Sequence, residues 1–193
     1  RACLHASHFE TADLILHPEM QWRGIRTQWL VFCEGHHARF NPWFKGLPWQ
    51  VVQGEILTVS ANKPWPKPII NYGEWLLPTD YHSARLGASF SQQLDLQPSA
   101  RAADNLLKGL ANVMPDLGEL TILDHQVGIR PATQDKQPFI GAHPQWPQML
   151  IFNGFGAKGS LAIPGSARRL LAYLRFNQPL PAYCDIQRLS WPD

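Results

Sequence analysis

The sequence has little charge and no block of basic residues. Of its 193 residues, 17% are charged, and 17 Lys+Arg against 15 Asp+Glu leave a formal net charge of +2. Proteins that bind nucleic acid or anionic lipid usually carry a basic patch or stripe. The composition therefore disfavours a nucleic acid as a partner. The 45% of hydrophobic residues are enough for one packed core or two small ones.

Cysteine is also scarce. The three cysteines, Cys3, Cys33 and Cys184, are odd in number and widely spaced, so they predict neither a disulfide framework nor a metal cluster. A reducing compartment is the simpler interpretation, and we predict a cytoplasmic location. Cys33 stands in an apolar strand-like segment and is expected to be an inert, buried thiol.

Long apolar runs are missing. No stretch approaches the roughly 18 consecutive apolar residues of a membrane span, and residues 1–10 lack the apolar centre of a signal peptide. We therefore expect a soluble chain. It begins at Arg1 and enters strand-like sequence almost at once, which we interpret as a fragment or a processed chain.

Short β-rich runs occupy the first half. Segments 12–18, 22–25 and 28–34 are expected to form a meander that feeds one buried strand ending at Gly35. Residues 50–60 predict a longer strand.

Within that longer strand, Gly54 predicts either a bulge or a close contact. Residues 72–74 look like a turn between two strands, and residues 85–90 predict a further strand. Together these segments indicate an antiparallel sheet.

The hydrophobic period changes to that of a helix at Ser99. Ser99 can cap the helix, Pro115 marks its far end, and Leu106, Leu107 and Leu110 predict the face that packs on the sheet.

Downstream of this helix the sequence predicts a strand over 121–129, a loop over 130–141, a buried strand over 149–152 and a second helix over 159–176. The predicted class is α/β, with an antiparallel sheet covered by a helix.

A glycine-rich turn lies between the last predicted strand and the second helix. Residues 154–159 match G-x-G-x-x-G, as a dinucleotide-binding turn would. An ordinary Rossmann unit is disfavoured, because only residues 177–193 follow the helix and they contain two prolines and no sustained apolar run. The turn still predicts free backbone N–H groups and partial positive charge facing an anionic group.

Arg130 ends a predicted strand and precedes a stiff loop. A single arginine is commonly part of a structural or surface ion pair. The functional alternative is a planar guanidinium that binds a substrate carboxylate through two hydrogen bonds.

Four motifs in the same order resemble those of the flavin-dependent amine oxidoreductases, which include glycine oxidase, sarcosine oxidase and D-amino-acid oxidase. Residues 128–135 are similar to G-[LIF]-R-P-x-T-x-D, followed by P-x-I-G at 138–141. Residues 152–164 resemble the C-terminal strand, turn and helix that contact the flavin. The other two matches are LVFCEG at 30–35, a late strand of the FAD domain, and VVQGE at 51–55, the opening of the substrate-domain sheet.

This resemblance implies a division of the chain. Residues 1–27 would end the substrate-domain meander, 28–49 would be a late FAD-domain strand and linker, 50–130 the substrate-binding domain, and 131–193 the C-terminal strand, glycine turn and helix of the FAD domain.

The same resemblance implies an activity: oxidation of a C–N bond in an amino acid or N-substituted amino acid by hydride transfer to FAD. No protein nucleophile or metal is needed, and the partners are a small amine or amino-acid substrate and an N-terminal FAD-binding half. Arg130 would hold the substrate carboxylate. The implied cofactor-binding residues are Gly35, Gly154, Phe155, Gly156, Ala157, Lys158, Gly159 and Ser160.

Two departures from the family pattern matter. No G-x-G-x-x-G follows a first strand, so these 193 residues are expected to be inert alone. The family's turn usually carries an aromatic residue and an arginine where Gly156 and Ala157 stand, which leaves the substrate open. The alternatives are a non-catalytic module that binds a carboxylate ligand and a structural or interaction domain.

The remaining conspicuous residues favour structural roles. His36 and His37 are neighbours on a segment expected to be extended, where adjacent side chains point apart, so a metal site is disfavoured. His5 and His8 lack a third ligand. The tryptophans that could wall a substrate pocket are more often plain packing; they are Trp43, Trp49, Trp65 and Trp75.

Overall fold

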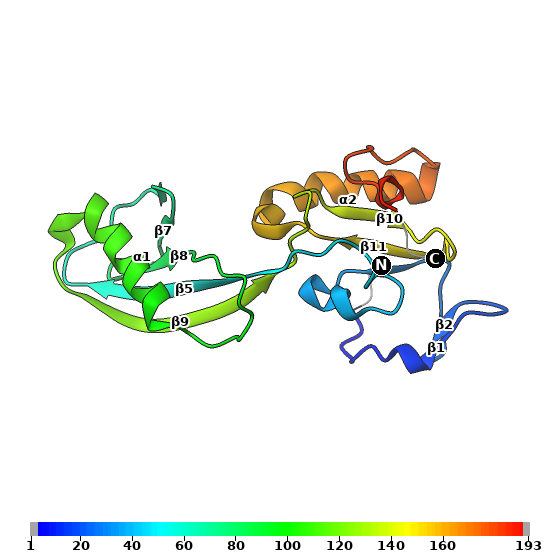
Figure 1. The fold of residues 1–193 in the computed structure, drawn as a ribbon, viewed down its shortest axis with the longest axis horizontal. Helices are drawn as coiled ribbons and strands as arrows, with labels where there is room; N and C mark the ends of the chain where they lie inside the picture. Colours follow the sequence, from blue (N-terminus) through cyan, green and yellow to red (C-terminus); the bar gives the residue numbers. More distant parts are fainter. Residues whose placement is uncertain (1–3, 191–193) are drawn as a thin grey trace.

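The computed structural model describes residues 4–190 and has two lobes joined by a pair of long strands (Figure 1). Cys3 lies outside the described residues. The long strands are β5 (Val52–Ala61) and β9 (Leu120–Arg130). They are antiparallel to each other and connect the first lobe to the second.

The first lobe is an antiparallel sheet of five strands covered by one helix. The strand order is β6-β7-β8-β5-β9. The three remaining strands are β6 (Ile70–Asn71), β7 (Trp75–Pro78) and β8 (Ser83–Gly87). Side chains alternate along β5 between a buried face and a less buried one, because successive residues of a strand point to opposite sides of the sheet. Leu57 and Val59 belong to the buried face.

Helix α1 (Ala100–Val113) covers that buried face. Leu106 and Leu110 are fully buried against the sheet, and Leu107 packs at the edge of the same cluster. The Ser99 side chain accepts a hydrogen bond from the backbone N–H of Ala102, at 3.1 Å, as an N-cap does. The predicted helix, its cap and its packing face are confirmed.

Substitution of Ser99 tests how this helix is anchored. Ser99→Ala removes the cap, which is worth about 1 kcal/mol, and also the hydroxyl that donates to the buried Glu55 carboxylate at 3.1 Å. We expect a loss of roughly 1–3 kcal/mol in the free energy of unfolding, measured by urea denaturation. Ser99→Thr keeps the hydroxyl and is the control. Equal midpoints for the two variants would contradict this assignment.

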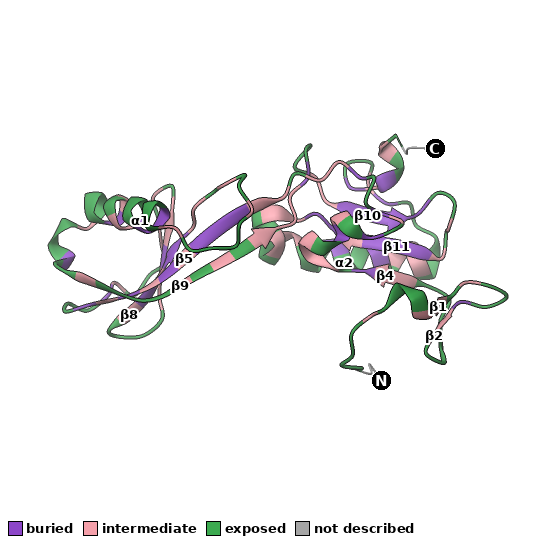
Figure 2. Cartoon of the chain, turned by 60° about the horizontal axis from the view of Figure 1, so that its bottom comes forward, coloured by how far each residue is buried: buried purple, intermediate pink, exposed green. Residues whose placement is uncertain are grey.

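The second lobe is built on a three-stranded sheet in the order β10-β11-β4. Its strands are β4 (Leu30–Phe32), β10 (Phe139–Ala142) and β11 (Met149–Asn153). β11 is antiparallel to β10 and parallel to β4. The predicted burial of residues 149–152 in a parallel pairing is thus confirmed, and Figure 2 shows that the centre of this sheet is buried.

Helix α2 (Gly159–Phe176) follows β11 through a short turn, and the predicted bounds 159–176 match the observed ones. The first residues form a small separate sheet, β1 (Leu14–Ile15), β2 (Gln21–Trp22) and β3 (Ile25–Arg26). The 3-10 turns are η1 (Thr11–Asp13), η2 (Gly35–Phe40), η3 (Pro115–Leu117), η4 (Gly156–Lys158) and η5 (Ile186–Arg188).

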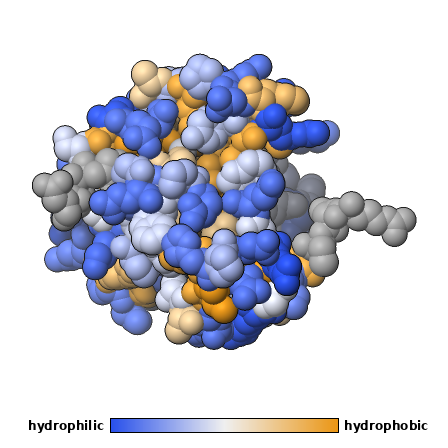
Figure 3. Space-filling view, turned by 90° about the vertical axis from the view of Figure 1, so that its right-hand side faces the viewer, coloured by the Kyte–Doolittle hydropathy of each residue, from blue (hydrophilic) through white to orange (hydrophobic). Residues whose placement is uncertain are grey.

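The outer end of the second lobe is mainly hydrophilic. Figure 3 views this end and shows hydrophobic residues interspersed among polar ones. Within residues 4–190, no helix combines the length and the apolar character that a membrane crossing requires.

Several predicted boundaries differ from the structure, and the strand predicted to end at Gly35 ends at Phe32. The strand predicted over 85–90 is β8, which begins at Ser83 and ends at Gly87; beyond it, Ser91 pairs separately with Gln53 of β5. The loop predicted over 130–141 ends at Pro138, because the next four residues pair with β11.

Two predictions about individual side chains were wrong. Cys33 is exposed, because it lies one residue beyond β4 and points away from the side on which Phe32 is buried. His36 and His37 do not point apart, since the segment is the 3-10 turn η2 and their ring centroids are 4.1 Å apart. Their side chains still belong to no group of three metal-ligating residues within 4–190.

Candidate functional site

Arg130 is the last residue of β9 and lies where the first lobe meets the second. It pairs with Val52 at the start of β5. Its side chain runs diagonally across the sheet face opposite helix α1, so that the guanidinium rests on the backbone of Gly54. Of the two alternatives predicted for Gly54, the close contact is confirmed; the register shift in β5 falls between Thr58 and Val59 instead.

A short segment after β8 also contacts the guanidinium. Nη1 of Arg130 donates to the carbonyl oxygen of Ser89 at 3.2 Å. Cζ of Arg130 lies 4.4 Å from the centroid of the Phe90 ring, within the range of a cation–π contact. The guanidinium therefore contacts a strand backbone, a carbonyl oxygen and an aromatic ring.

The positive charge of Arg130 has no acidic partner in the described part of the chain. Arg130 is half-buried, and burial lowers the pKa of its guanidinium. Within residues 4–190 it forms no ion pair with a carboxylate, and its one hydrogen bond goes to a neutral carbonyl. A half-buried cation in this state favours an anionic ligand, because a carboxylate can pair with the edge of the guanidinium through two hydrogen bonds.

The glycine turn lies directly beside the residues that follow Arg130. The backbone N–H of Gly156 donates to the carbonyl oxygen of Pro131 at 3.1 Å. Gly154 has a φ of +78° and packs against Thr133 and the backbone of Phe139, so the turn requires glycine there. This contact joins the end of β11 to the loop after β9.

Asn153 connects two of the sequence-predicted cofactor positions. Its buried side chain donates to the carbonyl oxygen of Gly35 at 2.9 Å and accepts from the N–H of Gly154 at 2.8 Å. The ends of the parallel strands β4 and β11 are thereby held together. Parallel α/β sheets commonly bind ligands beyond the carboxyl ends of their strands.

A pocket of about 410 Å³ opens between the glycine turn, the start of β5 and the loop after β9. That volume lies within the roughly 300–1,000 Å³ of small-molecule sites. The Phe90 side chain that covers Arg130 is also part of its wall. The lining residues are Gln50, Val52, Phe90, Ala132, Thr133, Lys136, Gly154, Phe155, Gly156, Ala157 and Lys158.

The described residues fit one end of a flavin. The turn offers backbone N–H groups, and α2, an 18-residue helix, has no side-chain cap at its start. Its partial positive charge suits a group on which negative charge develops. The apolar walls and Lys158 suit the ring itself. A second G-x-G-x-x-G that could hold the diphosphate is absent from the sequence.

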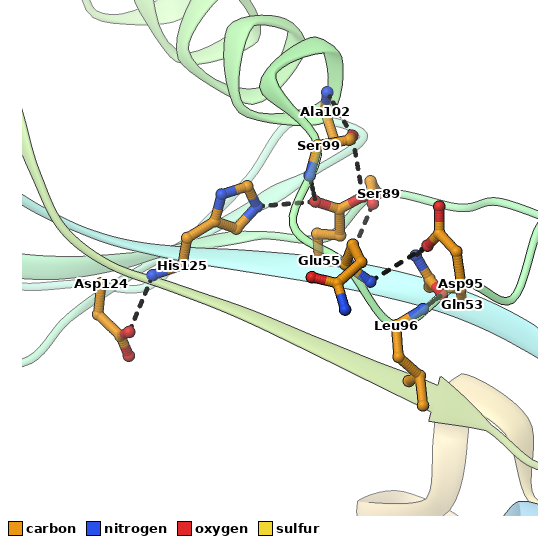
Figure 4. A network of polar contacts seen from close by, with 10 residues as sticks. Gln53, Glu55, Ser89, Asp95, Leu96, Ser99, Ala102, Asp124 and His125 are labelled. Atoms are coloured by element: carbon orange, nitrogen blue, oxygen red, sulfur yellow. Dashed lines mark hydrogen bonds and ion pairs between the residues drawn. The ribbon is translucent and has the colours of Figure 1, made fainter.

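A buried polar network lies on the opposite face of the sheet, beneath helix α1 (Figure 4). The Glu55 carboxylate accepts from the N–H of Ser99 at 2.9 Å and contacts Nε2 of His125 at 2.7 Å. Gln53 contacts Asp95 and the N–H of Leu96, each at 3.0 Å. These contacts place Glu55 and Gln53 in the anchoring of α1, away from Arg130.

Asp135, the last residue of the motif at 128–135, holds the loop after Arg130 to the turn η5 near the end of the chain. Its Oδ2 lies 2.7 Å from Nη2 of Arg188. Burial opposes the charged carboxylate, but the pKa of Asp135 is lowered overall by hydrogen bonds from the Gln137 N–H and from Arg188. Asp135 is therefore a structural anchor for a loop that borders the pocket.

The structure brings together some of the predicted site residues and not others. The turn from Gly154 to Lys158 lines the pocket, whereas Gly35, Gly159, Ser160 and Arg130 do not. The side chain of Arg130 contacts the pocket-lining Phe90, and its backbone contacts Val52 and Ala132, which also line the pocket. The roles of these residues stay predictions.

The sequence analysis missed several pocket residues and overestimated the tryptophans. Phe90 was assigned to a strand, and Gln50 and Lys136 carry no periodic signal that marks them. None of the four tryptophans considered lines the pocket. Trp65 is buried beneath α1, and Trp43 and Trp49 pack in the second lobe, which supports plain packing for these three.

Comparison with known proteins finds amine oxidases among the proteins similar to this chain. The chain is 22% identical over 136 residues to glycine oxidase of Pseudomonas aeruginosa, covering 69% of this chain and 37% of that protein. The structure of glycine oxidase from Geobacillus kaustophilus superposes with a TM-score of 0.71 and 25% identity, covering 90% of this chain and 48% of the other. For iminodiacetate oxidase from Chelativorans the TM-score is 0.72 at 23% identity, with 84% and 47% covered.

The chain thus spans less than half the length of these relatives. The model of the FAD dependent oxidoreductase family, abbreviated DAO, matches residues 12–174. That range includes both long strands, both helices, Arg130 and the whole glycine turn. The chain belongs to the DAO family of FAD-dependent oxidoreductases.

Proposed function

We propose that these residues supply the substrate-binding sheet and one flavin-contacting end of an enzyme that oxidises a C–N bond of an amino acid or N-substituted amino acid. The observation that carries the proposal is the half-buried Arg130, which has no acidic partner in residues 4–190 and lies one residue before the contact with the glycine turn. Glycine oxidase and iminodiacetate oxidase among the relatives are consistent with a small, carboxylate-bearing amine.

The residues divide the work between substrate and cofactor. Arg130 holds the carboxylate and so fixes the position of the neighbouring carbon. The turn from Gly154 to Gly159 and the start of α2 would hold one end of the flavin. Bound FAD would supply a hydride acceptor for the carbon alpha to the amine, with a proton lost from the nitrogen and hydrolysis of the resulting imine by water. The reaction also requires that the reacting C–H bond of the substrate is oriented toward the flavin. A rigidly held guanidinium that binds the carboxylate would meet this requirement.

The same proposal assigns the two lobes. Residues 50–130 form the substrate-binding domain, 28–49 and 131–193 belong to the FAD domain, and 1–27 end the substrate-domain meander. A cytoplasmic location is the accompanying proposal, supported by the sparse cysteines.

The direct test is anaerobic flavin reduction in the FAD-loaded enzyme that contains these residues, because it needs no assumption about the electron acceptor. Glycine, sarcosine and D-alanine are each compared with methylamine, which lacks a carboxylate. We expect bleaching of the flavin by at least one amino acid and none by methylamine. Carboxylate binding with no bleaching by any amine would instead identify a non-catalytic binding module.

A protein made of these 193 residues alone is expected to bind FAD weakly and to be inactive. In the family, a G-x-G-x-x-G turn that this sequence lacks would bind the pyrophosphate and provide most of the cofactor contacts. The glycine turn at 154–159 would contact only the other end of FAD. Equilibrium titration with FAD, followed by flavin fluorescence, measures the affinity. A yellow protein that retains stoichiometric flavin through purification would show that the Gly154 turn is sufficient.

Lys158 is expected to stabilise the negative charge of the reduced flavin, since it lines the pocket at the start of α2. Lys158→Met should slow anaerobic flavin reduction by roughly tenfold, the effect of about 1.4 kcal/mol in the barrier. Stopped-flow absorbance measures this rate. Lys136→Met, in the loop after β9 that also lines the pocket, is the comparison. An unchanged rate in Lys158→Met would place Lys158 in solvent.

A further inference from the structure

We infer that Gly54 and Phe90 are positioning residues that fix where the guanidinium of Arg130 is presented to the substrate. This inference rests on the proposed carboxylate clamp and deepens it. The two residues come from different elements, β5 and the segment after β8, and both contact the same guanidinium.

The contact with Gly54 leaves no room for a side chain. A Cβ built on Gly54 would lie closer than 3.0 Å to Nη1, Nη2 and Cζ of Arg130. No backbone atom of another residue is among its three nearest neighbours. An added methyl group would therefore displace the end of a flexible side chain and leave the strand in place. Gly54 thus acts on the clamp more than on the fold.

Phe90 is held in place by the backbone around it. Ser91 exchanges two hydrogen bonds with Gln53, each 2.9 Å, and the N–H of Ser89 donates to the carbonyl oxygen of Glu55 at 3.2 Å. The segment 89–91 is thereby fastened along β5 on both sides of Gly54. The centroid of the Phe90 ring lies 4.4 Å from Cζ of Arg130, and the Ser89 carbonyl accepts a hydrogen bond from Nη1 of Arg130.

The consequence for recognition is geometric. Gly54 and Phe90 limit the positions that the guanidinium can take, and the Ser89 carbonyl holds Nη1. A carboxylate can pair with two N–H groups along one edge of a guanidinium. These contacts therefore fix the position at which a carboxylate would be bound. Displacement by about 1 Å can cost on the order of 100-fold in rate.

The sheet offers a matched control for Gly54. Gly128 is the residue directly opposite Gly54 on β9, and a Cβ there would meet nothing within 4 Å. Gly54→Ala and Gly128→Ala thus add the same methyl group to the same face of the same sheet. Only the first should move Arg130.

The experiment uses the FAD-loaded enzyme that contains these residues. For Gly54→Ala we expect a rise of at least tenfold in KM for the amino acid and in Kd for acetate as a simple carboxylate probe, read from the flavin spectrum. Gly128→Ala should leave both constants within twofold. Phe90→Leu should weaken acetate binding, and Phe90→Tyr, which keeps the aromatic face, should restore it. Flavin content and the unfolding midpoint show that each variant is folded.

The possible results separate this inference from the proposed function. If Arg130→Ala raises KM but Gly54→Ala does not, Arg130 still binds the carboxylate and the positioning role of Gly54 is wrong. If neither variant changes KM or acetate affinity, the clamp itself is wrong. Equal effects of Gly54→Ala and Gly128→Ala would overturn the specific role of Gly54.

Discussion

Replacement of Arg130 by alanine is expected to raise KM for carboxylate-bearing substrates by roughly 30- to 3,000-fold, with a smaller change in kcat. Truncating one partner of a desolvated charge pair costs about 2–5 kcal/mol, and each tenfold step corresponds to about 1.4 kcal/mol. The loss falls mainly on binding because the guanidinium contacts the carboxylate before and during the reaction. Steady-state kinetics of the FAD-loaded enzyme measures both constants.

Two comparisons make this result specific. Arg130→Lys should recover little, because an ammonium group cannot form the two parallel hydrogen bonds of a guanidinium. Arg85→Ala removes another arginine from the same face of the sheet, where its Nη2 bonds only to Gln126 at 2.6 Å, and should change KM little. Unchanged kinetics in Arg130→Ala would show that Arg130 does not bind the substrate carboxylate. The proposed substrate class would then be wrong as well.

The second large effect is expected at Gly154. Its φ of +78° lies in the left-handed region, which costs a non-glycine residue roughly 1–2 kcal/mol. A Cβ would also lie 2.8 Å from Cγ2 of Thr133 and 3.0 Å from the backbone nitrogen of Phe139. A backbone atom of a buried strand cannot give way easily, so overpacking adds about 1–3 kcal/mol.

Gly154→Ala should therefore lower the free energy of unfolding by roughly 2–5 kcal/mol and weaken FAD binding, because it forces the turn away from the pocket. Urea denaturation and flavin titration measure the two effects. Gly156→Ala is the matched control: its φ of +53° carries the same conformational cost, but its nearest neighbour, the Ala132 Cβ, is 3.7 Å away. Equal losses in the two variants would show that packing at Gly154 is unimportant.

Local signals in the sequence were sufficient for the helices and for the class of the fold. Ser99 and Pro115 bound α1, the apolar spacing identified Leu106 and Leu110 as its core face, and residues 159–176 were predicted as α2 with its observed bounds. These features depend on residues a few positions apart, where capping chemistry and side-chain period act directly. The ordered motifs also identified the family, which the match over 12–174 confirms.

The tertiary structure decided how the candidate site is assembled. Gly54, Phe90 and Arg130 are separated by tens of residues in the sequence, and no local pattern shows that the guanidinium of Arg130 contacts both of the other two. The exposure of Cys33 and the close contact of the His36 and His37 rings likewise depend on where β4 ends and on the turn that follows it. Sequence alone thus determined which segments form helices and strands. The pairing of β5 with β9 and the fastening of residues 89–91 determined which side chains meet, because contacts between distant residues are set by sheet register and packing.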